Sequence, residues 1–262
     1  MSRLFVIKIG GNVIDRQESL QDFLKQFSKI QGKKILIHGG GSIASRIGDA
    51  LGIPSHYHKG RRITDKETLD LVTMVYGGLV NKQMVAQLQQ LGVNAIGLTG
   101  ADGNIIRATK RPANEIDFGF VGDLNEDSVN RTLLFSLLEQ EVVPVLAPLT
   151  HGNGTILNTN ADTIAQAVAV ALSGRHDVRL IYCFDKTGVL RDVNQSDSVI
   201  TKLNSLEYQN LLAAGALHDG ILPKLENAFE AIGQGVREVL IGDAENLLKN
   251  TTSDTIGTLI TA

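Results

Sequence analysis

Two kinds of apolar run alternate along the chain. Short unbroken aliphatic runs predict strands that are buried on both faces, and longer stretches with apolar residues every three to four positions predict helices. The predicted strands are residues 3–9, 33–38, 93–98, 142–148, 178–184, 237–242 and 257–261. The predicted helices are residues 18–30, 42–52, 65–91, 127–141, 163–174, 205–215 and 223–235. This alternation predicts an α/β fold whose mainly parallel sheet has helices on both faces.

The longest predicted helix, residues 65–91, shows its buried face in the sequence. Leu69, Val72, Val75 and Leu79 form one apolar stripe, and Thr64 or Asp65 can supply the N-cap. The remaining polar segments predict connecting β structure. Hairpins are expected at residues 56–64 and 151–162, and short β pieces at 104–110 and 118–124.

Composition narrows the class of protein. A net charge of -3 and a pI near 6.1 argue against electrostatic binding to nucleic acid or to an anionic membrane. No apolar stretch approaches the ~20 residues of a membrane span, and the N-terminus has no signal-peptide cleavage site. The single cysteine, Cys183, lies in a predicted buried strand. We therefore expect a cytoplasmic protein without disulfides.

Glycines follow most of the predicted parallel strands. The segments at these strand ends read "KIGGN", "HGGGS", "LTGADG", "LAPLTHGNG" and "FDKTGV". A single glycine pair can be an ordinary tight turn. Several glycine loops between a strand and a helix N-terminus instead favour a site for phosphate or carboxylate, because free backbone amides and the helix dipole both attract anions.

Known loop motifs fit this pattern poorly. The P-loop G-x-x-x-x-G-K-[ST] is absent. Gly39, Gly41 and Ala44 formally match the dinucleotide fingerprint, but the next strand region is the basic "HKGRRIT" rather than an acidic residue. The zinc motif HExxH is also absent, so we expect no metal held by protein ligands alone. The nucleophile elbow G-x-S-x-G of serine hydrolases is absent as well.

A few polar residues near these loops suggest phosphoryl transfer. Lys8 lies at the end of a buried strand, with one residue between it and the first glycine pair, where an unpaired lysine would be costly. Lys224 lies at the start of a helix, where a cation opposes the helix dipole. In "LNTNAD" a helix cap would explain Asn160 or Asp162, but not Asn158 as well. Two lysines, an aspartate and glycine loops are the parts that neutralise a transferred phosphoryl group.

At this point the sequence resembles the amino-acid kinase family, and within it the kinases that phosphorylate N-acetyl-L-glutamate. The resemblance covers essentially the whole chain and rests on ordered motifs. They are "IKIGGN", "IHGGGS", "GRRIT", "VNK", "GLTGADG", "FVGD", "LNTNAD", "DKTGVL" and "DGILPKLENA".

The resemblance implies a role for each matched residue. Lys8 and Lys224 would contact the transferred phosphoryl group, and Asp162 would organise both. The implied nucleotide-binding residues are Gly10, Gly11, Asp185, Lys186, Thr187 and Gly188. The implied acceptor-binding residues are Gly40, Gly41, Arg62, Asn158 and Asn160.

The resemblance also implies the architecture and the reaction. The fold would be an open three-layer α/β/α sandwich in one domain, residues 1–262, with an acceptor lobe to about residue 174 and a nucleotide lobe after it. ATP, with Mg²⁺ held mainly by its phosphates, would phosphorylate the γ-carboxylate of N-acetyl-L-glutamate, a step of arginine synthesis. The long helix would form a homodimer. A non-catalytic regulator of the same fold would lack Lys8, Asp162 or Lys224, and all three are present.

Three departures from the family pattern qualify these expectations. Arg61 replaces an aliphatic residue beside the implied substrate arginine, so an N-succinyl group could be the preferred acyl group instead of N-acetyl. "HGGGSIAS" lacks the usual proline and acidic residue after the glycines. The first strand begins at about Arg3, without the additional N-terminal helix of arginine-inhibited relatives, so we expect a dimer without arginine feedback.

Overall fold

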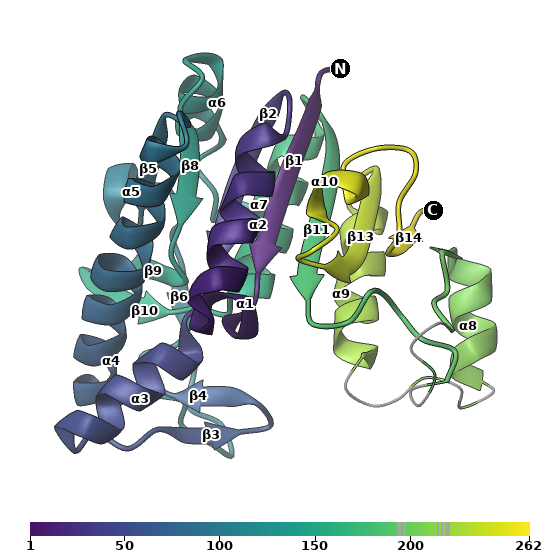
Figure 1. Ribbon diagram of the computed structural model, residues 1–262. Helices are drawn as coiled ribbons and strands as arrows, with labels where there is room; N and C mark the ends of the chain where they lie inside the picture. The colour runs from purple at the N-terminus through teal and green to yellow at the C-terminus, as the bar shows by residue number, and fades with distance from the viewer. Residues whose placement is uncertain (193–194, 196–197, 214, 216, 218–220) are drawn as a thin grey trace.

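A mixed eight-stranded sheet runs through the centre of the protein (Figure 1). The computed structural model describes residues 1–192, 195, 198–213, 215, 217 and 221–262. The strands follow one another across the sheet in the order β12 (Lys202–Leu203), β14 (Thr258–Ile260), β13 (Glu238–Asp243), β11 (Asp177–Phe184), β1 (Arg3–Ile9), β2 (Lys33–His38), β8 (Val143–Leu146) and β5 (Ala95–Leu98). All neighbours pair in parallel except β13 and β14. The prediction of a mainly parallel sheet is confirmed.

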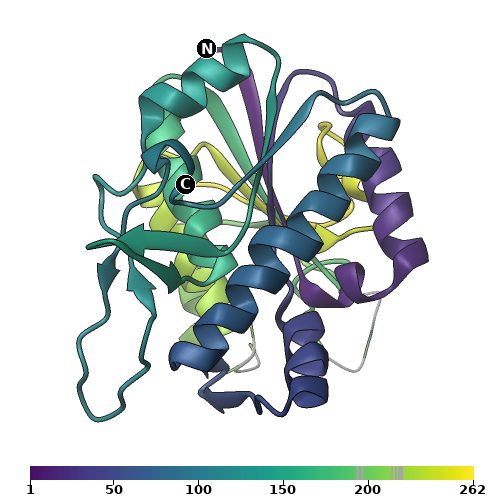
Figure 2. The ribbon, with the colours of Figure 1, turned by 90° about the vertical axis from the view of Figure 1, so that its left-hand side faces the viewer.

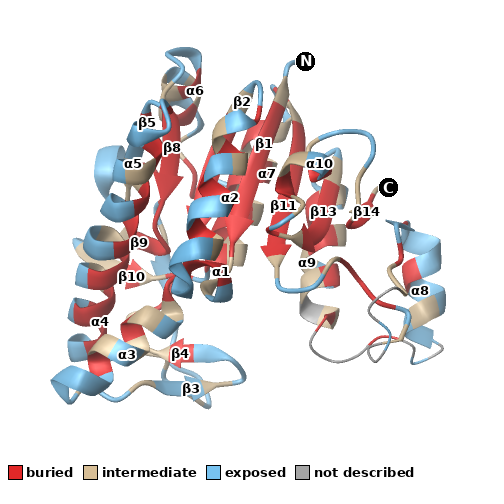
Figure 3. Ribbon diagram, viewed as in Figure 1, coloured by how far each residue is buried: buried red, intermediate tan, exposed pale blue. Residues whose placement is uncertain are grey.

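Helices cover both faces of this sheet, because alternate side chains of its strands enter two different cores. On β1, Leu4 and Val6 belong to one core, and Phe5 and Ile7 belong to the other. The first core is covered by α6 (Arg131–Glu139), α7 (Ala161–Ser173), α8 (Ser205–Ala213) and α9 (Leu222–Gly233). The second is covered by α1 (Gly11–Asp15), α2 (Gln17–Lys29), α3 (Gly41–Leu51), α4 (Lys66–Val72), α5 (Asn81–Gln90) and α10 (Leu247–Asn250). The buried strands between exposed helix surfaces are visible in Figure 3.

The helix predicted at residues 65–91 forms, but its buried stripe was predicted wrongly at one position. Between α4 and α5 lies a π-helical segment, η1 (Thr73–Val80), and Figure 2 shows all three as one continuous rod. Leu79 is 42% exposed, whereas Val80 is 3% exposed. A π turn contains more residues than an α turn, so it shifts the buried face along the sequence. Asp65 is the N-cap, since its carboxylate accepts from the Thr68 amide at 2.8 Å.

Other element boundaries also moved. Helical structure begins earlier than expected, with the short α1 directly after Gly10. α6 begins later than expected, because Asn130 caps it by accepting from the Leu133 amide at 3.1 Å. The last strand, β14, runs antiparallel to β13, which alternation of strands and helices does not predict. Within the described residues, no helix is both long and apolar enough to cross a membrane.

Three small hairpins lie beside the carboxyl ends of the central strands. They pair β3 (His56–His58) with β4 (Arg61–Ile63), β6 (Thr109–Lys110) with β7 (Gly122–Asp123), and β9 (Leu149–Gly152) with β10 (Thr155–Asn158). A short 3-10 turn, η2 (Asp102–Asn104), precedes β6. In Figure 1 the arrowheads of β1, β8 and β11 point toward the side of the molecule where β3 and β4 lie. Ligand sites of open parallel sheets lie at this edge.

Candidate active site

A cavity of about 230 Å³ lies at this edge of the sheet. Its walls come from the end of β1, the glycine loop before α3, the β3–β4 hairpin, β7, β10 and the first turn of α7. Of the residues predicted from sequence, Lys8, Gly40, Gly41, Arg62, Asn158, Asn160 and Asp162 line it. The fold therefore brings the predicted acceptor residues and two of the three predicted catalytic residues to one cavity.

Lys8 and Asp162 form an ion pair at the cavity wall. The Lys8 Nζ lies 2.7 Å from the Asp162 Oδ1, and both side chains are largely buried. This carboxylate oxygen has no hydrogen-bond donor among the described residues, so the contact is one of charge rather than an aligned hydrogen bond. Lys8 is the next-to-last residue of β1 and Asp162 lies in the first turn of α7, so packing of the helix on the sheet creates the pair.

Lys224, on α9, lies near the same aromatic ring as Lys8. Its Nζ lies 4.3 Å from the centre of the Phe184 ring, and the Lys8 Nζ lies 5.5 Å from the same centre. Among the described residues, Lys224 has no ion pair. The two predicted phosphoryl-contacting lysines are thus neighbours through one aromatic ring. The first two residues of the motif that contains Lys224, residues 219–220, lie outside the described residues.

Arg62 is a buried cation with no carboxylate partner among the described residues. It is 7% exposed, and its guanidinium donates to the Gly41 carbonyl at 2.8 Å and to the hydroxyls of Ser45 and Ser55. The guanidinium also lies 4.8 Å from the centre of the Tyr57 ring. Neutral partners fix its position without cancelling its charge. Such a group is suited to a carboxylate ligand, which would supply the missing countercharge.

Within the triple-glycine loop, only the middle position has a backbone conformation that requires glycine. Gly40 has φ +148°, a conformation that side chains disfavour, and a Cβ there would lie 3.0 Å from the Tyr76 ring. Gly39 and Gly41 would meet nothing closer than 3.7 Å. Gly39 and Gly41 line the cavity, and their missing side chains leave its space open.

The loop is held by a buried histidine that the sequence analysis did not single out. His38 Nδ1 lies 2.6 Å from the Gly39 carbonyl oxygen, and the Asn81 amide nitrogen lies 3.1 Å from His38 Nε2. Since a carbonyl only accepts, His38 donates from Nδ1 and accepts at Nε2. Burial lowers the pKa of His38 to about 4, so the ring is neutral at physiological pH.

The two asparagines of "LNTNAD" have different structural roles. Asn160 is the N-cap of α7, because its side-chain oxygen accepts from the amides of Asp162 and Thr163 at 2.8 and 3.2 Å. Asn158 ends β10, and its amide nitrogen donates to the Thr64 hydroxyl at 3.0 Å. Asn160 and not Asp162 is therefore the cap. The Asp162 carboxylate is left for Lys8.

The predicted nucleotide residues are not part of the lining of this cavity. The Asn12 amide donates to the Asp185 carboxylate at 2.8 Å, which places Asp185 next to the Gly10–Gly11 loop. Asp185 and Lys186 are exposed and Thr187 is half-buried. Gly188 has a packing role, since a Cβ there would lie 2.7 Å from the Thr258 hydroxyl.

Several cavity residues were not predicted. Tyr57 and Tyr76 supply aromatic walls, and Arg111 reaches the cavity while its guanidinium binds the Asp123 carboxylate at 3.0 and 3.2 Å. Tyr76 belongs to the π-helical segment, and such segments are frequent at functional sites. The adjacent Gly77-Gly78 pair inside a helical pattern was the sequence signal for this irregularity.

The chain is similar in sequence to known proteins. The model of the amino acid kinase family matches residues 3–243. An acetylglutamate kinase of Bacteroides fragilis is 56% identical over 240 residues, 91% of each chain. One of Cytophaga hutchinsonii is 52% identical over 265 residues and covers 100% of both chains.

Solved structures show the same fold. An N-acetylglutamate synthase from Neisseria gonorrhoeae, complexed with coenzyme A and N-acetyl-glutamate, superimposes with a TM-score of 0.83 at 23% identity, over 100% of this chain and 59% of that one. A carbamate kinase from Giardia lamblia bound to AMP-PNP superimposes with a TM-score of 0.72 at 13% identity, over 99% and 98% of the two chains.

Proposed function

The chain belongs to the amino acid kinase family, and we propose that Lys8, Asp162 and Lys224 carry out its phosphoryl transfer. The reaction is the phosphorylation of the γ-carboxylate of N-acetyl-L-glutamate by ATP, which gives the acyl phosphate and ADP in arginine biosynthesis. The observation that carries the assignment of residues is their convergence. Two lysines share one aromatic ring, and Asp162 pairs with Lys8 at a cavity lined also by Arg62, which has no carboxylate partner among the described residues.

For this reaction the protein needs mainly to position the two substrates and to neutralise the charge of the transferred phosphoryl group. A γ-carboxylate oxygen attacks the γ-phosphorus of ATP, the bond from that phosphorus to the β–γ bridging oxygen breaks, and ADP leaves with the electron pair. The acceptor is already an anion, so no general base is needed. Lys8 and Lys224 would neutralise the transferred group, and Asp162 would hold Lys8 in place until the phosphates arrive.

Arg62 would hold the α-carboxylate of the acceptor. Its guanidinium is fixed by neutral partners and has no carboxylate of its own among the described residues. Asn158 and the N-cap residue Asn160 line the same cavity and can donate to the acceptor from their amide nitrogens. The amides of Gly40 and Gly41 would face the developing charge on the acceptor carboxylate.

The nucleotide would use the loops on the other side of Lys8. Gly10 and Gly11 would lie over the phosphates, and residues 185–188 would form part of the nucleotide pocket. Within the described residues no three His, Cys, Asp or Glu side chains gather as a metal site. Mg²⁺ would be held mainly by the ATP phosphates and would supply further neutralisation of their charge.

ADP release with purified protein, ATP and Mg²⁺ tests the proposal. ADP release should be readily measured with N-acetyl-L-glutamate, and L-glutamate serves as the unacylated control. Absence of turnover with N-acetyl-L-glutamate would contradict the proposed function and favour the alternative, a non-catalytic regulator of the same fold.

A second acceptor, N-succinyl-L-glutamate, is favoured by one observation. Arg61 and Arg111 both line the cavity, and Arg61 has no ion pair among the described residues. An additional cation at the rim could bind the free carboxylate of a succinyl group. The same assay at equal concentrations of the two acceptors separates them. A higher kcat/KM for the succinyl compound would reassign the substrate without changing the mechanism.

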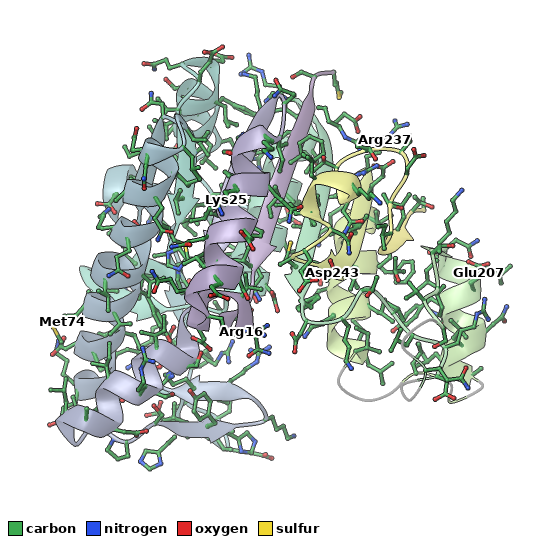
Figure 4. The ribbon with its side chains drawn as sticks, in the orientation of Figure 1. Arg16, Lys25, Met74, Glu207, Arg237 and Asp243 are labelled. Atoms are coloured by element: carbon green, nitrogen blue, oxygen red, sulfur yellow. The ribbon has the colours of Figure 1, made fainter. Side chains whose placement is uncertain are left out.

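We also propose a homodimer that uses the long helix. Met74 and Leu79 are exposed on η1, and Figure 4 shows Met74 pointing away from the body of the protein. β5, next to this helix, is the last strand of the sheet. Light scattering tests the dimer.

The cytoplasmic location and the lobe boundary near residue 174 stay predictions.

A further inference from the structure

Phe184 is the ring that the two lysines share, and neither the sequence motifs nor the reaction assigns it a function. It ends β11, directly before the predicted nucleotide residues. Lys8 and Lys224 come from β1 and α9, yet both ammonium groups lie within cation–π range of this ring, at 5.5 and 4.3 Å.

The strand register explains why the ring stands there. Lys8 pairs with Tyr182 across β1 and β11, so these two side chains point to the same face of the sheet. Phe184 follows two residues later and therefore shares that face. Its ring stacks on Tyr182 with 6.1 Å between centroids, and the Tyr182 hydroxyl donates to the Asp162 carbonyl at 3.4 Å. Tyr182 is fully buried, so the stack has a rigid base.

The charges around the ring show what it can contribute. Lys8 has a carboxylate partner, but Lys224 has none among the described residues. Two ammonium groups near each other repel, and a second carboxylate would relieve this only by cancelling charge that the phosphates need. The negative face of an aromatic ring attracts both cations and adds no net charge.

We propose that Phe184 is a positioning residue, an aromatic platform that holds the Lys8 and Lys224 ammonium groups in place for the transferred phosphoryl group. The inference rests on the proposed roles of the two lysines. It adds that their placement before ATP binds depends on the electron-rich face of one ring.

Fluorinated phenylalanines at position 184 test the platform. One, two or three ring fluorines weaken the attraction for cations stepwise and change the size of the side chain little. We expect kcat to fall with each fluorine, to about one-fifth to one-tenth of wild type with trifluorophenylalanine. KM for the acylated glutamate should not change, because Arg62 and not Phe184 faces the acceptor.

Phe135 provides the matched control. Its ring, on α6, lies 4.9 Å from the guanidinium of Arg175, which follows α7, and neither residue lines the cavity. Trifluorophenylalanine at Phe135 should leave kcat unchanged. Phe184→Leu, with circular dichroism to check folding, should lower kcat at least as far as the trifluoro residue. The fluorinated series decides the question if that variant does not fold.

Two outcomes would overturn the inference. One is a kcat that stays constant across the fluorinated series, and the other is an equal loss at Phe135. Lys8→Ala and Lys224→Ala separate this result from failure of the proposed function. If both lysine variants lose turnover and the fluorinated series does not, only the platform is wrong. If the lysine variants keep normal turnover, the proposed roles of the lysines are wrong.

Discussion

The ring of Tyr76 occupies the space that a side chain at Gly40 would need. A Cβ at Gly40 would lie 3.0 and 3.3 Å from two atoms of that ring, and the backbone there has φ +148°. The π-helical segment and the triple-glycine loop are therefore fitted to each other at the wall of the cavity.

We expect Gly40→Ala to lower both stability and activity. The disfavoured backbone and the contact with Tyr76 should cost about 1–3 kcal/mol in the free energy of unfolding. Urea unfolding measures this, and ADP release measures turnover. Gly39→Ala is the control, because its Cβ would approach nothing closer than 3.7 Å. An equally unstable Gly39→Ala variant would contradict the explanation.

Lys8→Ala should lose at least about 10²–10³ in kcat without unfolding, because it removes a preorganised donor to transition-state charge. ADP release and a thermal melt check the two parts. Lys25→Ala is a matched control, since Lys25 forms a 3.1 Å pair with Asp22 that is largely exposed. A folded Lys8→Ala variant with near-normal turnover would end the proposed role.

Arg62→Lys should raise KM for N-acetyl-L-glutamate by about 10- to 100-fold, because lysine keeps the charge but not the planar fork held by Gly41, Ser45 and Ser55. Initial rates at saturating ATP measure it. Arg61→Lys, on the exposed hairpin, is the neighbouring control and should leave that KM within about twofold. Similar KM values for Arg62→Lys and wild type would show that another group binds the carboxylate.

Arg61→Ala tests the second acceptor. If Arg61 binds a succinyl carboxylate, the variant should lose about 10-fold in kcat/KM for N-succinyl-L-glutamate and little for N-acetyl-L-glutamate. The ratio of the two values is the readout. Equal losses for both acceptors would assign Arg61 no part in the choice of acyl group.

His38 should make stability depend on pH. Its pKa is about 4 in the folded protein, against about 6.5 in an unfolded chain, because burial disfavours the charged ring. Between these values the unfolded chain binds a proton that the folded protein does not. The free energy of unfolding should therefore fall as the pH drops from about 6.5 toward 4, by an amount on the order of 2 kcal/mol.

Urea unfolding at pH 7 and pH 5 measures this loss. Burial also lowers the pKa of His176, which adds a change of the same sign. The informative quantity is thus the difference between wild type and His38→Asn, in which the amide can still donate to Gly39. The pH 7 to 5 loss should be smaller in the variant. An unchanged loss would show that His38 is not the group responsible.

The class of fold and most of the chemistry could be predicted from the amino-acid sequence alone. Unbroken aliphatic runs such as residues 3–9 and 178–184 require a sheet that is covered on both faces, and period and length distinguish strands from helices without reference to distant residues. Glycine loops at strand ends, together with Lys8, Arg62 and Asp162, indicated an anion site, because parallel strands bring their carboxyl ends to one edge.

The remaining features depend on contacts between residues that are distant in the sequence, and only the folded structure shows them. The π-helical segment buried Val80 instead of Leu79, since local periodicity cannot show where a helix widens against its neighbours. The neutral state of His38, and the lack of a carboxylate partner for Arg62 among the described residues, follow from which side chains surround them. The platform at Phe184 exists only because β1, β11 and α9 place two lysines on one ring, and sequence spacing carries no information about that meeting.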